Sequence, residues 1–416
     1  MPSPELDLTR IRAEFPALNT DMVFLDNAGG SQVLARVADR IRDYLLNDNV
    51  QHGASYAPSQ RASERVLAAR RSIAELINAP HDEEIVMGPA TTALIGTLVE
   101  ALRPSLKAGD EVIVTETDHE SNIGAWTRLA NDGVVVKIWP VDRTRLTLVL
   151  DDLQALLSPR TKWVAMTLAS NVLGTVNPVA EVARRVHAVG GRLCVDAVAY
   201  APHRLVDVQA TGADAVVFSF YKVFGPHYAV LWVQRELLLS LPSLNHFFIG
   251  TDNLPYKLQR GNVNYELSWG CAGIADYLSD VGTELGATGN KRSRMQVAFD
   301  AFARHEDALA ERLLTWLRER PGVRIIGRPS ITAGERVPTI SFVVEGVHSE
   351  TIVQQVDRHN IGIRFGDFYA RRLIEALGLQ EQGGVVRVSI AHYNTMDEID
   401  RLVSALDKAI GAIKPA

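Results

Sequence analysis

Residues 213–226, ADAVVFSFYKVFGP, decide how the rest of the chain is interpreted. The apolar, β-branched and aromatic run from Ala215 to Phe218 predicts a buried strand, and Gly225-Pro226 ends the turn that follows it. Lys222 lies in that turn, where the buried strand meets accessible surface. An amine among apolar neighbours has its charged form disfavoured, which suits a lysine that attacks carbonyls and forms Schiff bases. The alternative is a solvated lysine at the end of a strand.

A second short strand, within GRLCVDAVA at residues 191–199, delivers the carboxylate of Asp196 at its C-terminal end. In open parallel sheets these strand ends line the ligand crevice. A lysine and an acid from successive strands suit pyridoxal phosphate, because the lysine holds the aldehyde as an imine and the carboxylate keeps the pyridine nitrogen protonated. A helix cap or turn residue is the alternative for Asp196, and the pairing with Lys222 favours the cofactor.

Further candidate residues follow other predicted strands. Thr91 and Thr92 open a helix, where backbone N–H groups and hydroxyls form an anion site for the cofactor phosphate, although each threonine is also an ordinary N-cap. The imidazole of His119 can stack on a flat ring, with a capping or surface histidine as the alternative. The amide of Asn171 can reach a ring oxygen. The preceding strands are predicted at residues 84–87, 109–114 and 163–168.

Composition narrows the classes of function. The chain has 416 residues, 47% of them apolar, which is enough for a large core and two or three domains. A net charge of −6 without basic runs argues against nucleic acid or a membrane as partner. No stretch resembles a signal peptide or a membrane span, and the two cysteines fit a reducing compartment, so we expect a cytoplasmic protein. The sequence has no GxGxxG after a strand and no compact His/Cys cluster, which disfavours a nicotinamide-dependent dehydrogenase and a metal enzyme.

The order of elements predicts an α/β fold class. Strands alternate with helices from about residue 20 to 235, which implies a mostly parallel sheet covered on both faces. Beyond residue 290 the pattern becomes that of a smaller α+β domain. Ser31 is expected to cap the helix that follows it, and Thr395 and Glu398 form a capping box for the last helix. We predict an N-terminal arm at residues 1–20, a large domain at 21–290 and a C-terminal small domain, associated with the arm, at 291–416. In the small domain we expect strands at 323–326, 339–344 and 385–390, and helices at 293–319, 350–358 and 395–413.

With these residues in place, the chain resembles the class V aminotransferase family of fold-type I pyridoxal-phosphate enzymes, and especially its cysteine-desulfurase-like branch. The similarity covers nearly the whole chain, and its motifs keep their order. They are LDNAGGSQ at 25–32, ATT at 90–92, DHESN at 118–122, SNVLGTVNP at 170–178, VDAVAYAPH at 195–203, SFYK at 219–222, LQRGNVN at 258–264 and VRVSIAHYNT at 386–395.

The resemblance implies a homodimer, a large domain with a mostly parallel seven-stranded sheet, and roles for individual residues. Lys222 would form the internal aldimine, and Arg387 would bind the substrate carboxylate. Gly261 and Asn262 would reach the phosphate of the neighbouring subunit. The implied catalytic residues are Lys222, Asp196 and His119. The implied cofactor-binding residues are Thr91, Thr92, His119, Asn171, Asp196, Ser219, Tyr221, Lys222, Gly261 and Asn262. The expected substrate-binding residues are Asn27, Ala28, His52, Arg364, Tyr369 and Arg387, with Tyr56, Phe365 and Phe368 also shaping the pocket.

Four positions depart from the desulfurase pattern. Ala199 stands where the resemblance places a glutamine, so one contact to the ring oxygen is missing. Tyr221 replaces the histidine before the lysine, and Asn262 replaces a threonine in the subunit-crossing loop. The loop GIRFGDFY ends in Tyr369, where the resemblance places the nucleophilic cysteine.

These departures bear on the reaction. Cys194 is predicted to be buried and Cys271 to lie in an apolar helix-like stretch, so neither is a good nucleophile. A phenol is mostly protonated at neutral pH and forms no persulfide. Tyr369 is therefore expected to line the substrate cavity, with proton donation to a leaving group as the alternative.

We expect a pyridoxal-phosphate enzyme that acts on an amino acid or amino-acid conjugate through an external aldimine. Elimination of the carbon–sulfur lyase type, without persulfide chemistry, is the favoured outcome. Transamination, decarboxylative deamination and epimerisation on a bulky amino acid stay open. A non-catalytic relative of the fold is the alternative from another class, and the joint presence of lysine, aspartate, histidine and arginine argues against it.

Overall fold

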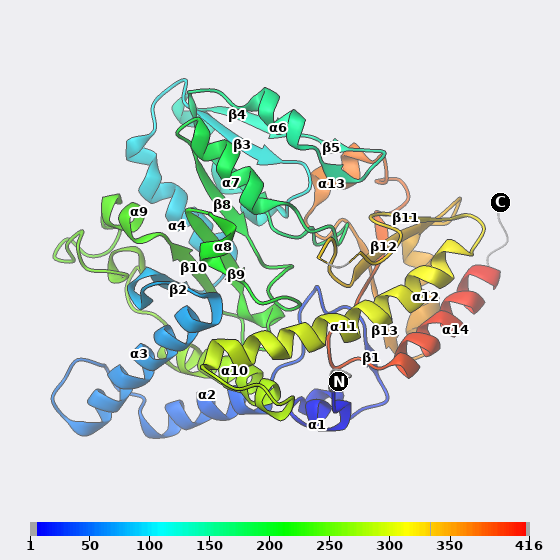
Figure 1. Cartoon of the computed structure of the whole chain (residues 1–416), viewed down its shortest axis with the longest axis horizontal. Helices are drawn as coiled ribbons and strands as arrows, with labels where there is room; N and C mark the ends of the chain where they lie inside the picture. Colours follow the sequence, from blue (N-terminus) through cyan, green and yellow to red (C-terminus); the bar gives the residue numbers. More distant parts are fainter. Residues whose placement is uncertain (1–5, 333, 413–416) are drawn as a thin grey trace.

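Two sheets organise residues 6–332 and 334–412, which are described by a computed structural model. A seven-stranded sheet with its helices forms the larger part of the molecule, and a four-stranded sheet with C-terminal helices lies beside it (Figure 1). The long helix α11 (Lys291–Arg318) runs from one part to the other (Figure 1). The chain therefore changes its architecture near the position where the sequence pattern changes.

The seven-stranded sheet has the order β2-β10-β9-β8-β7-β3-β4. Only β10 is antiparallel to its neighbours, so the predicted mostly parallel sheet is confirmed. The sequence pattern had not singled out β4, which is half exposed at the edge of the sheet, or the reversed strand β10. The strands are β2 (Ile85–Gly88), β3 (Glu111–Thr115), β4 (Val135–Trp139), β7 (Thr161–Thr167), β8 (Arg192–Asp196), β9 (Ala215–Ser219) and β10 (Ala229–Val233).

Alternating side chains of each strand pack into different cores, as the period of two requires. In β9, Val216 and Phe218 join one core, whereas Ala215 and Val217 join the core on the other face. Helices pack against both faces of the sheet, so the central strands carry apolar side chains on both faces. The first core includes α2 (Ala35–Asn47), α3 (Ala57–Ile77), α6 (Leu150–Leu156), α7 (Val179–Ala188), α8 (Val208–Thr211), α10 (Tyr265–Glu284) and α11. The second core includes α4 (Thr91–Leu102), α5 (Gly124–Thr127) and α9 (Arg235–Ser240).

The small domain is built on an antiparallel sheet of order β11-β12-β15-β14. The expected strands and helices are present, and the structure adds strand β14, which the sequence did not predict. The predicted end of the last helix at Ile413 lies outside the described residues, as do residues 1–5 of the arm. No helix in the described ranges is long and apolar enough to cross a membrane. The elements are β11 (Val323–Ile325), β12 (Thr339–Val344), β14 (Arg364–Gly366), β15 (Val385–Ser389), α12 (Ser349–Asp357), α13 (Arg371–Ala376) and α14 (Met396–Ala412). Shorter elements are α1 (Leu8–Ala13), β1 (Val23–Phe24), β5 (Val141–Asp142), β6 (Thr147–Leu148) and β13 (Ile361–Gly362).

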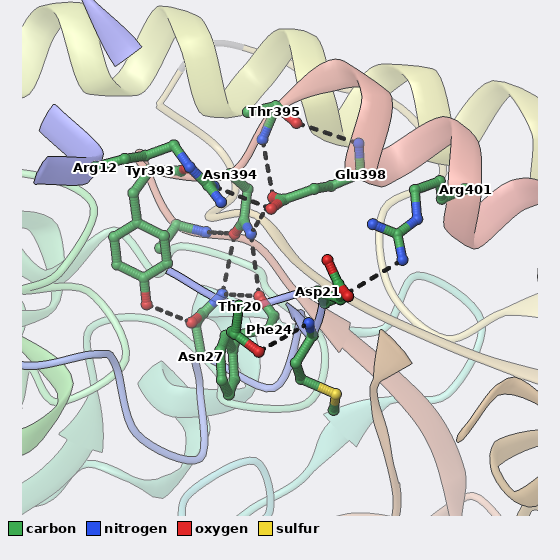
Figure 2. Close-up of polar contacts among 12 residues, drawn as sticks. Arg12, Thr20, Asp21, Phe24, Asn27, Tyr393, Asn394, Thr395, Glu398 and Arg401 are labelled. Carbon is green, nitrogen blue, oxygen red and sulfur yellow. Dashed lines mark hydrogen bonds and ion pairs between the residues drawn. The ribbon is translucent and has the colours of Figure 1, made fainter. Parts of the chain in front are cut away.

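A buried polar network fastens the N-terminal segment to the small domain (Figure 2). Asn27 donates to Asn394 Oδ1 at 3.1 Å and accepts from the Tyr393 hydroxyl at 2.5 Å. Arg12 donates to Glu398 Oε1 at 2.9 Å. The capping box is confirmed, because Thr395 and Glu398 exchange bonds at 3.1 and 3.2 Å. The network fixes the turn after β1, which pairs in parallel with β13.

The predicted helix cap at Ser31 is wrong, and its hydroxyl instead bonds to the turn that carries Lys222. Helix α2 begins after Leu34, which makes no side-chain cap bond. The Ser31 hydroxyl accepts from the backbone N–H of Phe224 at 2.8 Å, and the Ser31 N–H donates to the carbonyl of Tyr221 at 3.0 Å. The segment after β1 therefore holds both sides of Lys222 in place.

Candidate active site

The carboxyl ends of β2, β3, β7, β8 and β9 converge on one pocket of ≈ 490 Å³ at the edge of the large sheet. Parallel strands place the residues that follow them at the same edge, which is where open α/β sheets bind ligands. All eight candidate cofactor residues outside the loop of Gly261 and Asn262 line this pocket. The lining residues are Ala90, Thr91, Thr92, His119, Ser121, Thr167, Ala169, Asn171, Asp196, Val198, Ala199, Ser219, Tyr221 and Lys222.

Lys222 ends a single 3₁₀ turn (Phe220–Lys222) directly after β9, and its side chain is buried. The turn closes tightly, since a Cβ on Gly225 would lie 2.8 Å from the side chain of Ile274. Burial and the positive charge of Arg387 lower the pKa of Lys222, while Asp196 acts in the opposite direction. A lysine with a lowered pKa has more neutral amine near neutral pH, and the neutral amine is the nucleophile.

Two carboxyl groups at this end of the sheet are buried. Asp196 accepts from the Val198 N–H at 2.8 Å, and burial raises its pKa. Asp118 accepts from the Asn122 amide at 3.1 Å, and its pKa is raised well above the usual range by burial and by the charge of Asp196. Asp196 lines the pocket, so it is the carboxylate that faces a ligand. The motif DHESN contained Asp118, but we had not singled it out.

The N-terminus of α4 supplies hydroxyl and N–H donors. Thr91 Oγ1 lies 2.6 Å from Ser219 Oγ, so residues from two different strand ends share one hydrogen bond. The N-cap of α4 is Ala90, which has no side-chain cap bond, so neither Thr91 nor Thr92 is the N-cap. Hydroxyls gathered at the start of a twelve-residue helix suit an anion such as phosphate.

His119 combines the two roles that the sequence offered for it. Its Nδ1 accepts from the Ser121 N–H at 3.1 Å and caps a short 3₁₀ turn (Glu120–Asn122), while its ring also lines the pocket. Burial and the charges of Lys222 and Arg387 lower the pKa of His119 to about 4. The imidazole is therefore neutral at neutral pH, and because Nδ1 accepts, the proton lies on Nε2.

Arg387, on β15 of the small domain, contacts Asn171, which lines the pocket. Its Nη2 donates to Asp26 Oδ1 at 2.8 Å, its Nη1 donates to the carbonyl of Asn171 at 3.2 Å, and its guanidinium lies 3.7 Å from the ring centre of Phe368. Arg364 lies 3.8 Å from the same carboxylate of Asp26. The buried Nε of Arg387 has no hydrogen-bond partner within residues 6–332 and 334–412. An unpaired donor on a buried cation suits an anionic ligand.

The loop after β14 lies beside the pocket, in contact with Asn171 and His119. Phe368 and Tyr369 both have left-handed backbone conformations, with φ of 53° and 58°. The Asn171 amide donates to the carbonyl of Phe368 at 2.9 Å, and the N–H of Glu120 donates to the carbonyl of Tyr369 at 2.8 Å. The Tyr369 ring centre lies 5.2 Å from that of His119. This loop is thus attached to two of the residues that line the pocket.

Several predicted site residues lie elsewhere in this single chain. His52 is hydrogen-bonded to the Tyr256 hydroxyl at 2.8 Å, and the side chain of Asn27 is committed to the network of Figure 2. The N–H of Ala28 donates to Ser389 Oγ at 2.8 Å. Gly261 is next to a different cavity, which Asn262 lines near α4 and α10. The sequence analysis missed Asp26, Asp118, Ser121 and Thr167. Asp26 and Asp118 each directly precede a predicted site residue, Asn27 and His119, and this adjacency could have indicated them.

Comparison with known proteins agrees with this geometry. The aminotransferase class-V family matches residues 23–402. Aminotransferase-like protein FGM3 of Gibberella zeae is 40% identical over 99% of this chain and 100% of its own length. Cysteine desulfurase-like protein ustD of Aspergillus flavus is 32% identical over 97% of this chain and 91% of its own length.

Solved structures show the same architecture. The cysteine desulfurase CsdA of Escherichia coli superimposes with a TM-score of 0.85 at 29% identity, covering 99% of this chain and 100% of that chain. A cysteine desulfurase of Thermococcus onnurineus NA1, at 23% identity, shares the fold with a TM-score of 0.87 over 99% of this chain and 100% of its own. The chain therefore belongs to the aminotransferase class-V family, in its cysteine-desulfurase-like branch, and has the fold-type I architecture.

Proposed function

We propose that this protein is a pyridoxal-phosphate-dependent lyase that eliminates a substituent from an amino acid or amino-acid conjugate, of the carbon–sulfur lyase type, without persulfide chemistry. The observation that carries the proposal is the residue at the end of the loop after β14, which is Tyr369. The sequence contains two cysteines, Cys194 and Cys271, and both are buried. Burial raises the pKa of each thiol far above its usual range, so neither is available as a thiolate.

The donor set of the pocket fits the cofactor of the family. Lys222 supplies the amine for the aldehyde, and Asp196 supplies the carboxylate for the ring nitrogen. Thr91, Thr92 and Ser219 supply hydroxyls for the phosphate. Pyridoxal phosphate, when bound, supplies an electron sink for charge that develops at the α-carbon of the substrate.

The side chains around this group have separable roles. His119, neutral and fixed through Nδ1, offers a flat face for the ring. The Asn171 amide donates one N–H to the carbonyl of Phe368 and has a second N–H for the ring oxygen. Lys222 is the base that takes a proton from the α-carbon. Arg387 binds the α-carboxylate, since two hydrogen bonds from a guanidinium orient a carboxylate well. In a homodimer, Gly261 and Asn262 would approach the phosphate of the other copy, which explains their distance from Lys222 in one chain.

The visible spectrum of purified protein tests the cofactor first. A yellow chromophore that borohydride reduces onto Lys222 supports the proposal, and its absence after reconstitution with pyridoxal phosphate removes it. The protein is then incubated with S-methyl-L-cysteine, and methanethiol, pyruvate, alanine and carbon dioxide are measured. Equal amounts of methanethiol and pyruvate support elimination. Amino transfer to a keto acid, loss of carbon dioxide, or racemisation would instead indicate one of the other outcomes.

Free cysteine provides the second arm of this test. With a reductant present, elimination gives sulfide and pyruvate, because the sulfur is released directly and no enzyme-bound persulfide forms. Rapid release of alanine and sulfide in equal amounts would show that the interpretation of Tyr369 is wrong. Lys222→Ala is the matched control, which should keep the fold and lose both activities.

A further inference from the structure

Two consecutive aromatic residues adopt a backbone conformation that their side chains disfavour. Phe368 and Tyr369 have φ of 53° and 58°, in the region that non-glycine residues rarely occupy. Such a conformation persists only where the surrounding contacts hold it in place. Here both carbonyls are held, by Asn171 at 2.9 Å and by the Glu120 N–H at 2.8 Å. The Tyr369 N–H is held by Asp367 Oδ1 at 2.9 Å.

The rings of Phe368 and Tyr369 lie in different environments. Phe368 is 8% exposed and packs under the guanidinium of Arg387. Tyr369 is 69% exposed, and its ring is tilted by 36° against His119 at the rim of the pocket. The exposed phenol of Tyr369 therefore lies beside His119, which lines the pocket.

Other acidic groups of the pocket are less suited to protonate a group that leaves from the substrate. Neutral His119 holds Nδ1 toward Ser121 and has only a weakly acidic N–H. Tyr221 is stacked on His227, with ring centres 5.1 Å apart, and burial raises its pKa. Asp118 is fully buried and does not line the pocket. Lys222 is already required as the base at the α-carbon.

We propose that Tyr369 is the acid that protonates the leaving atom in the elimination; this inference rests on the function proposed above. The amine of Lys222 takes the proton from the α-carbon, and the bond between the β-carbon and sulfur breaks. The electron pair of that bond leaves with the sulfur, which takes the phenolic proton of Tyr369. The ammonium of Lys222 releases its proton to water and the phenolate takes one from water, so both groups are restored. The 2-aminoacrylate product hydrolyses to pyruvate and ammonium. The substrate class is therefore an amino acid with a poor leaving group, such as an alkyl thiolate.

Leaving groups that differ in their need for a proton test this role. Tyr369→Phe keeps the ring against His119 and removes only the hydroxyl. With S-methyl-L-cysteine, kcat should fall by about 10²-fold or more, the size of general acid catalysis. With β-chloro-L-alanine, whose chloride leaves without a proton, the initial rate should change by no more than about threefold. Binding of L-2-aminobutyrate, measured by calorimetry, should be the same in both proteins.

Controls separate this inference from the function on which it rests. Arg371→Gln changes an exposed residue of the adjoining helix, whose side chain pairs with Glu375 at 2.8 Å, and should leave both substrates unaffected. Equal loss with both substrates in Tyr369→Phe, or no loss with either, overturns the acid role while leaving the lyase proposal standing. A wild-type enzyme that eliminates neither substrate overturns the lyase proposal itself.

Discussion

Replacing Lys222 by methionine should stabilise the cofactor-free protein at neutral pH. Burial, followed by the charge of Arg387, lowers the pKa of Lys222 from 10.5 to about 8. One pKa unit corresponds to about 1.36 kcal/mol, so the buried ammonium destabilises the fold by ~3 kcal/mol at pH 7. Lys222→Met removes this cost at similar length, but it also removes a charge that favours ionised Asp196. We therefore expect a net gain of ~2 kcal/mol at pH 7.

The pH dependence distinguishes this effect from better packing. The folded state binds the lysine proton less tightly than the unfolded chain, so the cost is full below about pH 8 and falls as the pH rises toward 10.5. At pH 10 the advantage of the variant should be below ~1 kcal/mol. Urea unfolding of both cofactor-free proteins, at one protein concentration and at pH 7 and 10, measures it.

A surface lysine supplies the control. Lys107 is exposed, so Lys107→Met should change the free energy of unfolding by less than ~0.5 kcal/mol at either pH. A Lys222→Met protein that is less stable than wild type at pH 7 would refute the reasoning. An advantage that stays constant up to pH 10 would do the same, because it would not come from the ammonium.

Asp196→Ala should bind pyridoxal phosphate more weakly, by equilibrium dialysis, and lose most turnover, since an unprotonated pyridine is a poorer electron sink; unchanged affinity would contradict its role. Arg387→Ala should chiefly raise KM for a carboxylate substrate, whereas a lower Tm with unchanged KM would indicate a structural residue. His119→Phe should leave the acidic limb of the pH–rate profile unchanged between pH 5.5 and 7, because the pKa of His119 is lowered to about 4; a displaced limb would show that His119 titrates there. S-benzyl-L-cysteine should have a kcat/KM about tenfold or more above that of S-carboxymethyl-L-cysteine, because a second charge on the substrate is disfavoured. Equal values would show that the site does not discriminate against a second charge.

Much of the pocket could be predicted because a parallel sheet turns sequence position into spatial position. Any polar residue directly after a buried parallel strand lies at the same edge of the sheet, so Asp196, Lys222, Asn171 and His119 had to meet. Apolar runs bounded by glycine and polar turns located those strands. The position of Thr91 followed from the helix that begins after β2.

Other features depend on contacts between segments far apart in the chain. Ser31 has the residue type of a helix cap, and its real partner, the Phe224 N–H, lies in the lysine turn. Asp26 and Arg387 lie 361 positions apart in the chain, and only the folded structure shows that they pair. The left-handed conformation of Phe368 and Tyr369 has no glycine or asparagine to signal it. Single-sequence patterns record local preference, and each of these features is decided by a distant partner.

The charges around the pocket restrict the substituent that a substrate can carry. Asp26 is shared by Arg387 and Arg364, at 2.8 and 3.8 Å, so this group has one excess positive charge, which a single α-carboxylate neutralises. At the rim, Arg372 is paired with Glu120 at 3.2 Å, and the free face is that of Tyr369. A second charge on the substrate would lose water without gaining a counter-charge, which disfavours it. A neutral, bulky substituent can instead pack against the Tyr369 ring, within reach of its hydroxyl. The same placement of Tyr369 thus accounts for both the expected leaving-group dependence and the preference for neutral conjugates.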